Sequence, residues 1–157
     1  MRAKFQVLVV PYCMINNKLK VCIFKRKSTK VWQFIAGGGE DDESEYEAAL
    51  REFREETHIT CIAGIEQLDT SCSIPTCFFK EKYDLDWEKD CYVIPEKAFS
   101  YYVCSKDIFR IQLSSEHIKY KWTSYEKAMK LLYYDSNKTA LWELRERIRN
   151  TKNERKN

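Results

Sequence analysis

The sequence predicts an α/β fold in a single domain. Strand-like apolar segments open the chain, a glycine run then leads into a helix with a complete N-terminal cap, and apolar residues at helical spacing return near the carboxyl end. A sheet flanked by helices is the natural packing for such a series of elements.

Length and composition favour a soluble globular domain. A chain of 157 residues suits one domain, which we place at 1–150, followed by a polar tail at 151–157 that we expect to fray. Hydrophobic residues make up 44% and charged residues 32%, which is ordinary for this class. The net charge of +3 is too small to indicate nucleic acid or a membrane surface, although it modestly favours anionic substrates.

The first elements are two strands joined as a hairpin. Residues 5–13 and 19–26 read as strands, and the polar stretch Asn16–Lys18 reads as the turn. Pro11 fits a strand at the edge of the sheet or the end of a strand. The apolar segment 31–36 predicts the next strand, followed by a glycine loop at 37–39.

A helix is predicted to begin after Ser44 and to end at Thr57. Ser44 and Glu47 have the spacing of a capping box. Its core-facing residues recur at helical spacing: Tyr46, Ala49, Leu50 and Phe53. His58 would then occupy the left-handed position that usually holds glycine, at a cost of about 1–2 kcal/mol.

The remaining elements alternate less regularly. Residues 61–72, 98–104 and 119–123 read as strands, and residues 124–133 and 136–149 as helices. The region 73–97 shows no feature that can be tied to a base. Four aromatic residues in it are candidates for stacking or, equally, for packing: Phe78, Phe79, Tyr83 and Trp87.

Three carboxylates share one face of the capped helix. Glu52, Glu55 and Glu56 lie at positions i, i+3 and i+4, where like charges destabilise an isolated helix. A divalent cation would relieve this repulsion, and Mg²⁺ binds carboxylates and substrate phosphates together. A solvated acidic face is the alternative. The glycines permit close approach to a phosphate, but the G-x-x-x-x-G-K-[ST] pattern is absent.

Residues 37–59 as a whole resemble the signature of the Nudix hydrolases, G-x5-E-x7-R-E-U-x-E-E-x-G-U with U apolar. The matching positions are Gly37, Glu43, Arg51, Glu52, Phe53, Glu55, Glu56 and Ile59, and His58 replaces a glycine. The resemblance implies an α/β/α sandwich with a mixed central sheet. It also implies Mg²⁺ or Mn²⁺ held by Glu52, Glu55 and Glu56.

A second segment narrows the resemblance. Residues 114–122 read SSEHIKYKW, and with Trp32-Gln33 and Ser136-Asn137 they resemble bacterial dihydroneopterin triphosphate pyrophosphohydrolases, also described as dATP pyrophosphohydrolases. The resemblance implies that Glu116 reaches the metal cluster as a ligand or as the base. The alternative is a surface glutamate. Ala36 departs from the pattern, because many Nudix sequences have proline there.

The resemblance also assigns roles to other motif residues. Either Glu52 or Glu116 would take a proton from the attacking water, and Arg51 would hold a motif glutamate in place. Gly37, Gly38 and Gly39 would approach the phosphates. Glu43 would support the loop or an outer metal, or it would only favour the helix dipole.

The function expected from these features is metal-dependent cleavage of a nucleoside triphosphate, such as dATP or dihydroneopterin triphosphate, to monophosphate and pyrophosphate. The alternatives are a hydrolase of dinucleoside polyphosphates or nucleotide sugars, and a non-catalytic nucleotide-binding module. We expect a small nucleotide as partner, no nucleic acid or membrane, and a homodimer as one arrangement. Seven cysteines without a C-x-x-C pair favour a reduced cytoplasmic protein with free thiols.

Overall fold

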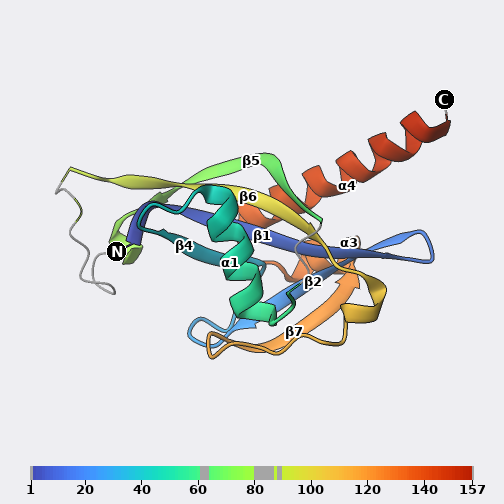
Figure 1. The fold of residues 1–157 in the computed structure, drawn as a ribbon, viewed down its shortest axis with the longest axis horizontal. Helices are drawn as coiled ribbons and strands as arrows, with labels where there is room; N and C mark the ends of the chain where they lie inside the picture. Colours follow the sequence, from blue (N-terminus) through green and yellow to red (C-terminus); the bar gives the residue numbers. More distant parts are fainter. Residues whose placement is uncertain (1, 61–63, 80–86, 88–89, 157) are drawn as a thin grey trace.

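The computed structural model describes residues 2–60, 64–79, 87 and 90–156 (Figure 1). These residues form seven strands in one mixed sheet with the order β3-β2-β1-β6-β5, in which β4 also pairs with β1 and β7 with β2. β1 and β6 run parallel, and the other paired strands run antiparallel. The strands are β1 (Arg2–Ile15), β2 (Lys18–Arg26), β3 (Trp32–Gln33), β4 (Ile35–Glu40), β5 (Ile65–Pro75), β6 (Val93–Tyr102) and β7 (His117–Ser124).

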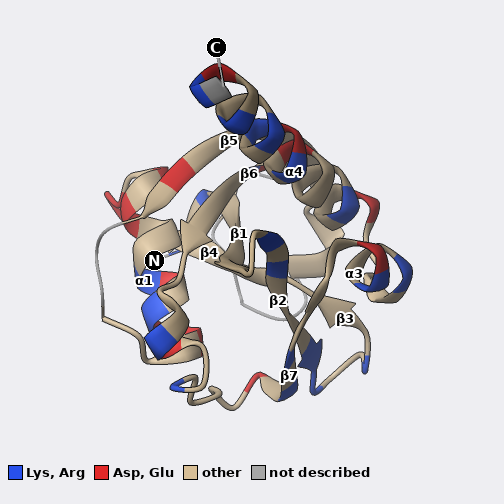
Figure 2. Cartoon of the chain, turned by 90° about the vertical axis from the view of Figure 1, so that its right-hand side faces the viewer, with Lys and Arg blue, Asp and Glu red and all other residues tan. Residues whose placement is uncertain are grey.

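Helices cover both faces of the sheet. They are α1 (Glu45–Thr57), α3 (Tyr125–Leu131) and α4 (Asp135–Lys156), with a short 3-10 helix η1 at Ser105–Asp107. Ala49 and Phe53 of α1 belong to one buried apolar cluster, whereas Ala128 of α3 and Leu141 of α4 belong to another. Figure 2 shows α1 on one side of the strands and α3 and α4 on the other. The predicted α/β/α sandwich with a mixed sheet is confirmed.

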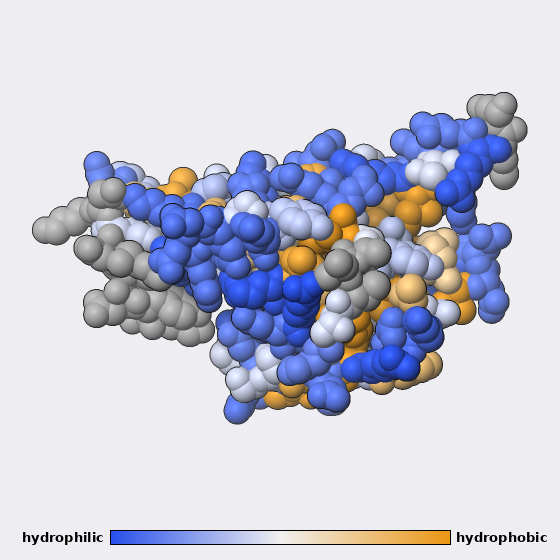
Figure 3. Space-filling view, viewed as in Figure 1, coloured by the Kyte–Doolittle hydropathy of each residue, from blue (hydrophilic) through white to orange (hydrophobic). Residues whose placement is uncertain are grey.

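The outward faces of the helices are polar. In Figure 3 hydrophilic residues cover α1, and hydrophobic residues show beside it. Basic and acidic residues are interspersed along α4 (Figure 2), so this helix does not present a face of one charge. Within the described ranges, no helix is long and apolar enough to cross a membrane.

Both ends of α1 form as predicted. The Ser44 hydroxyl accepts a hydrogen bond from the backbone N–H of Glu47 at 3.2 Å, and the Glu47 carboxylate accepts one from the N–H of Ser44 at 2.8 Å. His58 has φ 60° and ψ 17°, and its N–H donates to the Arg54 carbonyl at 2.8 Å. Nδ1 of the His58 imidazole also lies 2.7 Å from the Gln112 carbonyl oxygen. This contact offsets part of the strain of the left-handed backbone.

The first hairpin is confirmed, but the prediction for Pro11 is wrong. Asn16 and Asn17 both have positive φ, 51° and 63°, as a tight turn between β1 and β2 requires. Pro11 is buried in the middle of β1, a central strand. On one side, β1 pairs with β4 up to Val9 and with β2 from Tyr12 onward. Pro11 lies where β1 changes partner, so its missing N–H interrupts neither ladder.

The three glycines lie in a strand, whereas the sequence predicted a loop. Gly37 pairs with Val7, and Gly38 pairs with Gln6, as part of β4. The turn comes later, at residues 41–42, where Asp41 has φ 39°. Pairing with the distant strand β1 holds these glycines extended, and a local pattern does not reveal that pairing.

Several boundaries differ from the predicted ones. β5 begins at Ile65. β6 begins at Val93, whereas the sequence predicted a strand only from residue 98. Residues 61–63 of the predicted strand 61–72 lie outside the described residues. α4 continues to Lys156, so residues 151–156 form its last turns. Fraying of these turns stays a prediction. The cysteines at 13, 22, 72, 77, 91 and 104 are free, and Cys61 lies outside the described residues.

Candidate active site

A cavity of about 890 Å³ gathers most of the residues that the sequence predicted to be functional. It is bordered by β4, α1, the end of β5, the middle of β6 and the start of α4. Its lining includes eight of the predicted residues: Gly37, Gly38, Gly39, Arg51, Glu52, Glu55, Glu56 and Glu116. Glu43 is not among the lining residues, but it bonds to Arg51, which is. The structure therefore connects all nine.

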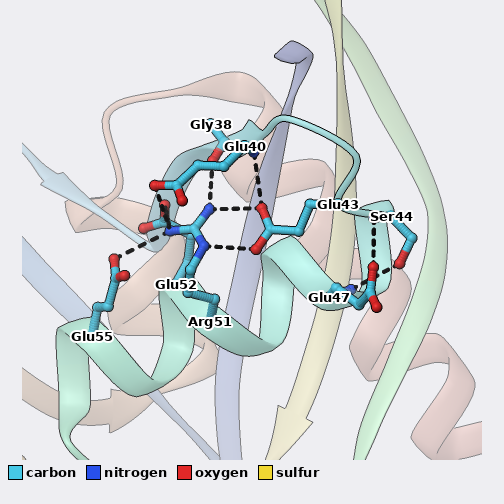
Figure 4. Close-up of polar contacts among 8 residues, drawn as sticks. All are labelled: Gly38, Glu40, Glu43, Ser44, Glu47, Arg51, Glu52 and Glu55. Carbon is cyan, nitrogen blue, oxygen red and sulfur yellow. Dashed lines mark hydrogen bonds and ion pairs between the residues drawn. The ribbon is translucent and has the colours of Figure 1, made fainter. Parts of the chain in front are cut away.

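Arg51 forms the centre of this arrangement (Figure 4). Its Nε and Nη2 donate to the two oxygens of Glu43 at 2.7 and 3.0 Å. Its Nη1 donates to Glu52 at 2.9 Å and to Glu55 at 3.2 Å, and its Nη2 also donates to the Gly38 carbonyl at 2.8 Å. One guanidinium thus joins the turn before α1, the middle of the helix and strand β4, which suits the fixed fork of donors on arginine.

Glu43 connects the turn before α1 to the helix. Besides Arg51, it accepts a hydrogen bond from the backbone N–H of Glu40 at 2.9 Å. The hydrogen bond from Arg51 is the main cause that lowers the pKa of Glu43, and the backbone bond of Glu40 adds to it. The carboxylate therefore stays ionised and fixes residues 40–43 against Arg51.

Glu52 is buried directly beside strand β4. A Cβ atom at position 37 would overlap its carboxylate, so only glycine lets the strand pass this close. Burial raises the pKa of Glu52 to about 7, and the nearby Glu55 and Glu56 act in the same direction, while Arg51 opposes them. Glu52 therefore exchanges its proton near neutral pH.

Glu56 has different partners, which come from the far end of the chain. Its Oε2 accepts hydrogen bonds from Nδ1 of His117 at 2.7 Å and from the Ser114 hydroxyl at 2.5 Å. Burial alone would raise the pKa of Glu56, but these two hydrogen bonds, together with the charges of His117 and Arg26, outweigh burial and lower it. An ionised carboxylate only accepts hydrogen bonds, so Nδ1 of His117 carries the proton.

Sequence reasoning assigned no role to His117 or Ser114. Both belong to the segment SSEHIKYKW, which the sequence pattern singled out. Nothing in the sequence indicated that these two side chains bond to Glu56. His117 is buried, and its ring also lies 5.3 Å from that of Phe24, centroid to centroid. Its Nε2 has no hydrogen-bond partner among the described residues.

Glu116 borders the cavity but lies at its surface. Its side chain is 48% exposed, and its Oε2 lies 3.7 Å from Nη1 of Arg26, which also lines the cavity. The structure brings Glu116 to the same cavity as Glu52, Glu55 and Glu56, and pairs it with a cation at the rim.

The donor set fits a hard divalent cation. Glu52, Glu55 and Glu56 offer carboxylate oxygens along one helix face toward one cavity, the kind of ligand that Mg²⁺ and Mn²⁺ prefer. No three such groups among the described residues already form a compact cluster. In this structure Glu52 and Glu55 bond to Arg51, and Glu56 bonds to His117.

A second polar cluster on the cavity wall was missed by the sequence prediction. Glu96 of β6 accepts a hydrogen bond from the Gln6 amide at 2.7 Å, and the Cys72 thiol lies 3.6 Å from its other oxygen. The alternation of buried and exposed residues along β6 could have indicated this cluster. Ile94, Glu96 and Ala98 share the buried face of β6, so a charged residue stands at an inward position.

Comparison with known proteins gives a consistent result. The family model described as NUDIX domain matches residues 5–143. A solved structure from Listeria monocytogenes described as a NUDIX hydrolase is 39% identical, covers 95% of this chain and 97% of its own, and superposes with a TM-score of 0.81. A comparison with curated proteins found no match.

Two more distant structures share the fold. The dihydroneopterin triphosphate pyrophosphohydrolase of E. coli is 22% identical, covers 89% of this chain and 93% of its own, and has a TM-score of 0.68. An Ap4A hydrolase of C. elegans is 19% identical, covers 94% of this chain and 99% of its own, and has a TM-score of 0.66.

Proposed function

The chain belongs to the Nudix family of hydrolases acting on phosphoric anhydride bonds, and on that premise we propose that it cleaves a nucleoside triphosphate to monophosphate and pyrophosphate. The leading substrates are dATP and dihydroneopterin triphosphate. The observation that carries the proposal is the single cavity shared by Glu52, Glu55, Glu56 and the three glycines. The segment around Glu116 and His117 supports the choice of a nucleoside triphosphate.

Divalent metal ions are a general requirement of this family, and we propose Mg²⁺ or Mn²⁺ here. Glu52, Glu55 and Glu56 would hold the ion, which when bound neutralises charge on the phosphoryl group and acidifies a water molecule. Arg51 keeps Glu52 and Glu55 close to the glycine strand. His117 and Ser114 hold the Glu56 carboxylate in one orientation.

Either of two carboxylates can accept the proton of the attacking water. Glu52 is buried, and its pKa of about 7 matches proton exchange at neutral pH. Glu116 lies at the rim of the cavity, with its Oε2 3.7 Å from Nη1 of Arg26. Gly37 has no side chain where strand β4 passes the Glu52 carboxylate, so the strand backbone and this carboxylate lie side by side at the cavity.

The proposal is tested by a substrate panel with purified protein and Mg²⁺ or Mn²⁺. The panel contains dATP, dGTP, dihydroneopterin triphosphate, Ap4A and ADP-ribose, and pyrophosphate and phosphate release are measured separately. We expect pyrophosphate from a nucleoside triphosphate. Faster cleavage of Ap4A or ADP-ribose would replace the proposed substrate class with the dinucleoside polyphosphate or nucleotide-sugar class. No product from any compound would contradict the enzymatic function.

A further inference from the structure

The cavity contains a buried carboxylate that the proposed reaction does not use. Glu96 is 5% exposed and lines the same cavity as Glu52 and Glu56. Gln6 of β1 and Cys72 of β5 are its registered neighbours on the two adjoining strands. The sheet itself therefore fixes the position of Glu96.

The groups around Glu96 all donate hydrogen bonds to it. Gln6 donates to Oε2 and the Cys72 thiol to Oε1. The amide of Gln6 cannot turn around, because Nη2 of Arg2 donates to its Oε1 at 3.2 Å and arginine has no acceptor. Burial raises the pKa of Glu96, while hydrogen bonds from Gln6, Cys72 and Ser136 oppose this. The surroundings thus present the carboxylate as an acceptor.

This carboxylate and the candidate metal ligands are connected through one residue of β4. Gly38 pairs with Gln6 in the sheet, and its carbonyl accepts a hydrogen bond from Arg51. Successive residues of β4 face opposite sides of the strand: Gly37 faces Glu52, whereas Gly38 faces Arg2, which bonds to Gln6. The Arg51 and Glu52 cluster and the Gln6 and Glu96 cluster therefore border the cavity in different places, here called its first and second ends. A ligand with phosphates at the first end would place its remaining group at the second.

The walls at the second end suit a flat heterocycle. Phe78 and Phe79 line the cavity after β5, and Phe78 is 68% exposed. The guanidinium of Arg2 lies 4.4 Å from the Phe79 ring centroid, so a planar cation and an aromatic ring stack at this wall. Tyr134 and Ser136 border the same cavity from the start of α4.

We propose that Glu96 selects the base, and that it binds a ring N–H together with an adjacent exocyclic amino group. Guanine and pterins present this pair of donors, which matches the two acceptor oxygens of one carboxylate. Adenine presents one amino donor beside the lone pair of N1, which a carboxylate oxygen would repel. The inference rests on the proposed function, and within it favours a guanine or pterin triphosphate over dATP.

The test compares kcat/KM of the wild type for dGTP, dITP and dATP. dITP lacks only the exocyclic amino group, so the comparison needs no substitution that might disturb folding. We expect dGTP to exceed both others by at least about tenfold, the value of one hydrogen bond to a charged group. Glu96→Gln should raise KM for dGTP and bring the three substrates within about threefold, while kcat changes little. Glu126→Gln, an exposed change on α3, is the matched control.

The outcomes separate the two proposals. Equal or faster hydrolysis of dITP and dATP by the wild type would overturn the assignment of Glu96 and leave the pyrophosphohydrolase function intact. If no triphosphate is hydrolysed, the proposed function fails, and calorimetric binding of dGMP against dIMP then tests Glu96 independently. Equal affinity for dGMP and dIMP would overturn the assignment.

Discussion

Nη1 of Arg51 lies 2.9 Å from Oε1 of Glu52, so a cation supplied by the same helix already compensates part of the acidic face. Nε and Nη2 of the same guanidinium donate to Glu43, which lies in the turn before the helix. The residue that compensates the candidate metal ligands is therefore also the one that fixes α1 to the preceding turn.

Replacement of Arg51 by lysine tests this double role. Lysine keeps the charge but cannot bond to Glu43 with two donors and to Glu52 at the same time. We expect Arg51→Lys to lower the free energy of unfolding by about 1–3 kcal/mol and kcat by about 10- to 100-fold. Urea unfolding and steady-state kinetics measure the two effects. Arg54→Lys, on the same helix, is the control, and equal losses in both variants would contradict the role given to Arg51.

The raised pKa of Glu52 predicts a pH-dependent stability in the absence of metal. Because its pKa in the folded protein is about 7, above the ordinary value of 4.5, folding favours the protonated form. This stabilisation is complete below pH 4.5 and is lost as the pH rises through 7.

Glu52→Gln should therefore stabilise the metal-free protein at alkaline pH. Glutamine removes the buried charge, and the repulsion from Glu55 and Glu56 with it, at the expense of the ion pair with Arg51. We expect the variant to gain stability relative to wild type as the pH rises from about 5 to about 8. The gain in the free energy of unfolding should reach about 2–3 kcal/mol, and the melting temperature should rise with it. Melting curves in excess chelator measure this. A difference that does not change with pH would show that Glu52 has an ordinary pKa.

Much of α1 could be predicted because its signals are local. The capping box of Ser44 and the left-handed His58 each depend on residues within one turn, and both form as expected. The spacing of Glu52, Glu55 and Glu56 likewise fixed their common face.

Contacts between distant segments of the chain could not be predicted from the sequence. The strand conformation of Gly37–Gly39 depends on pairing with β1, and the burial of Pro11 depends on where β1 changes partner. The bond from His117 to Glu56 joins residues 61 positions apart, and that from Gln6 to Glu96 joins residues 90 positions apart. Periodicity placed each residue on a strand or helix but gave no indication of these partners.

The hydrogen bond from His117 predicts that this residue acts through Glu56. Glu56→Gln should reduce kcat by at least about 100-fold without unfolding the protein, because a metal ligand is lost while the shape is kept. His117→Asn should weaken metal affinity by about 10- to 100-fold, since Glu56 loses the partner that orients it. Titration with Mn²⁺ followed by electron paramagnetic resonance measures affinity apart from activity. If His117→Asn lowers stability and leaves metal affinity unchanged, its role is structural only.

Glu116 is tested in combination with its partner. Glu116→Gln should lower kcat by at least about tenfold if this carboxylate serves as ligand or base. Arg26→Gln separates loss of the carboxylate from loss of its ion pair, because this variant removes the 3.7 Å pair and keeps Glu116. We expect Arg26→Gln to change kcat by less than about threefold, because an ion pair of 3.7 Å with a carboxylate that is 48% exposed is weak. Unchanged metal affinity and rate in Glu116→Gln would remove Glu116 from the site.

His58 allows backbone strain to be separated from a side-chain contact. His58→Ala keeps the left-handed φ of 60° and loses the hydrogen bond to the Gln112 carbonyl, so it should destabilise the protein by about 1–2 kcal/mol. His58→Gly loses the same hydrogen bond but relieves the strain, and it should be more stable than the alanine variant by about 1 kcal/mol. Urea unfolding of the three proteins gives both differences. Equal stability of the alanine and glycine variants would mean that residue 58 carries no backbone strain. In both variants kcat should remain near the wild-type value, because His58 does not line the cavity.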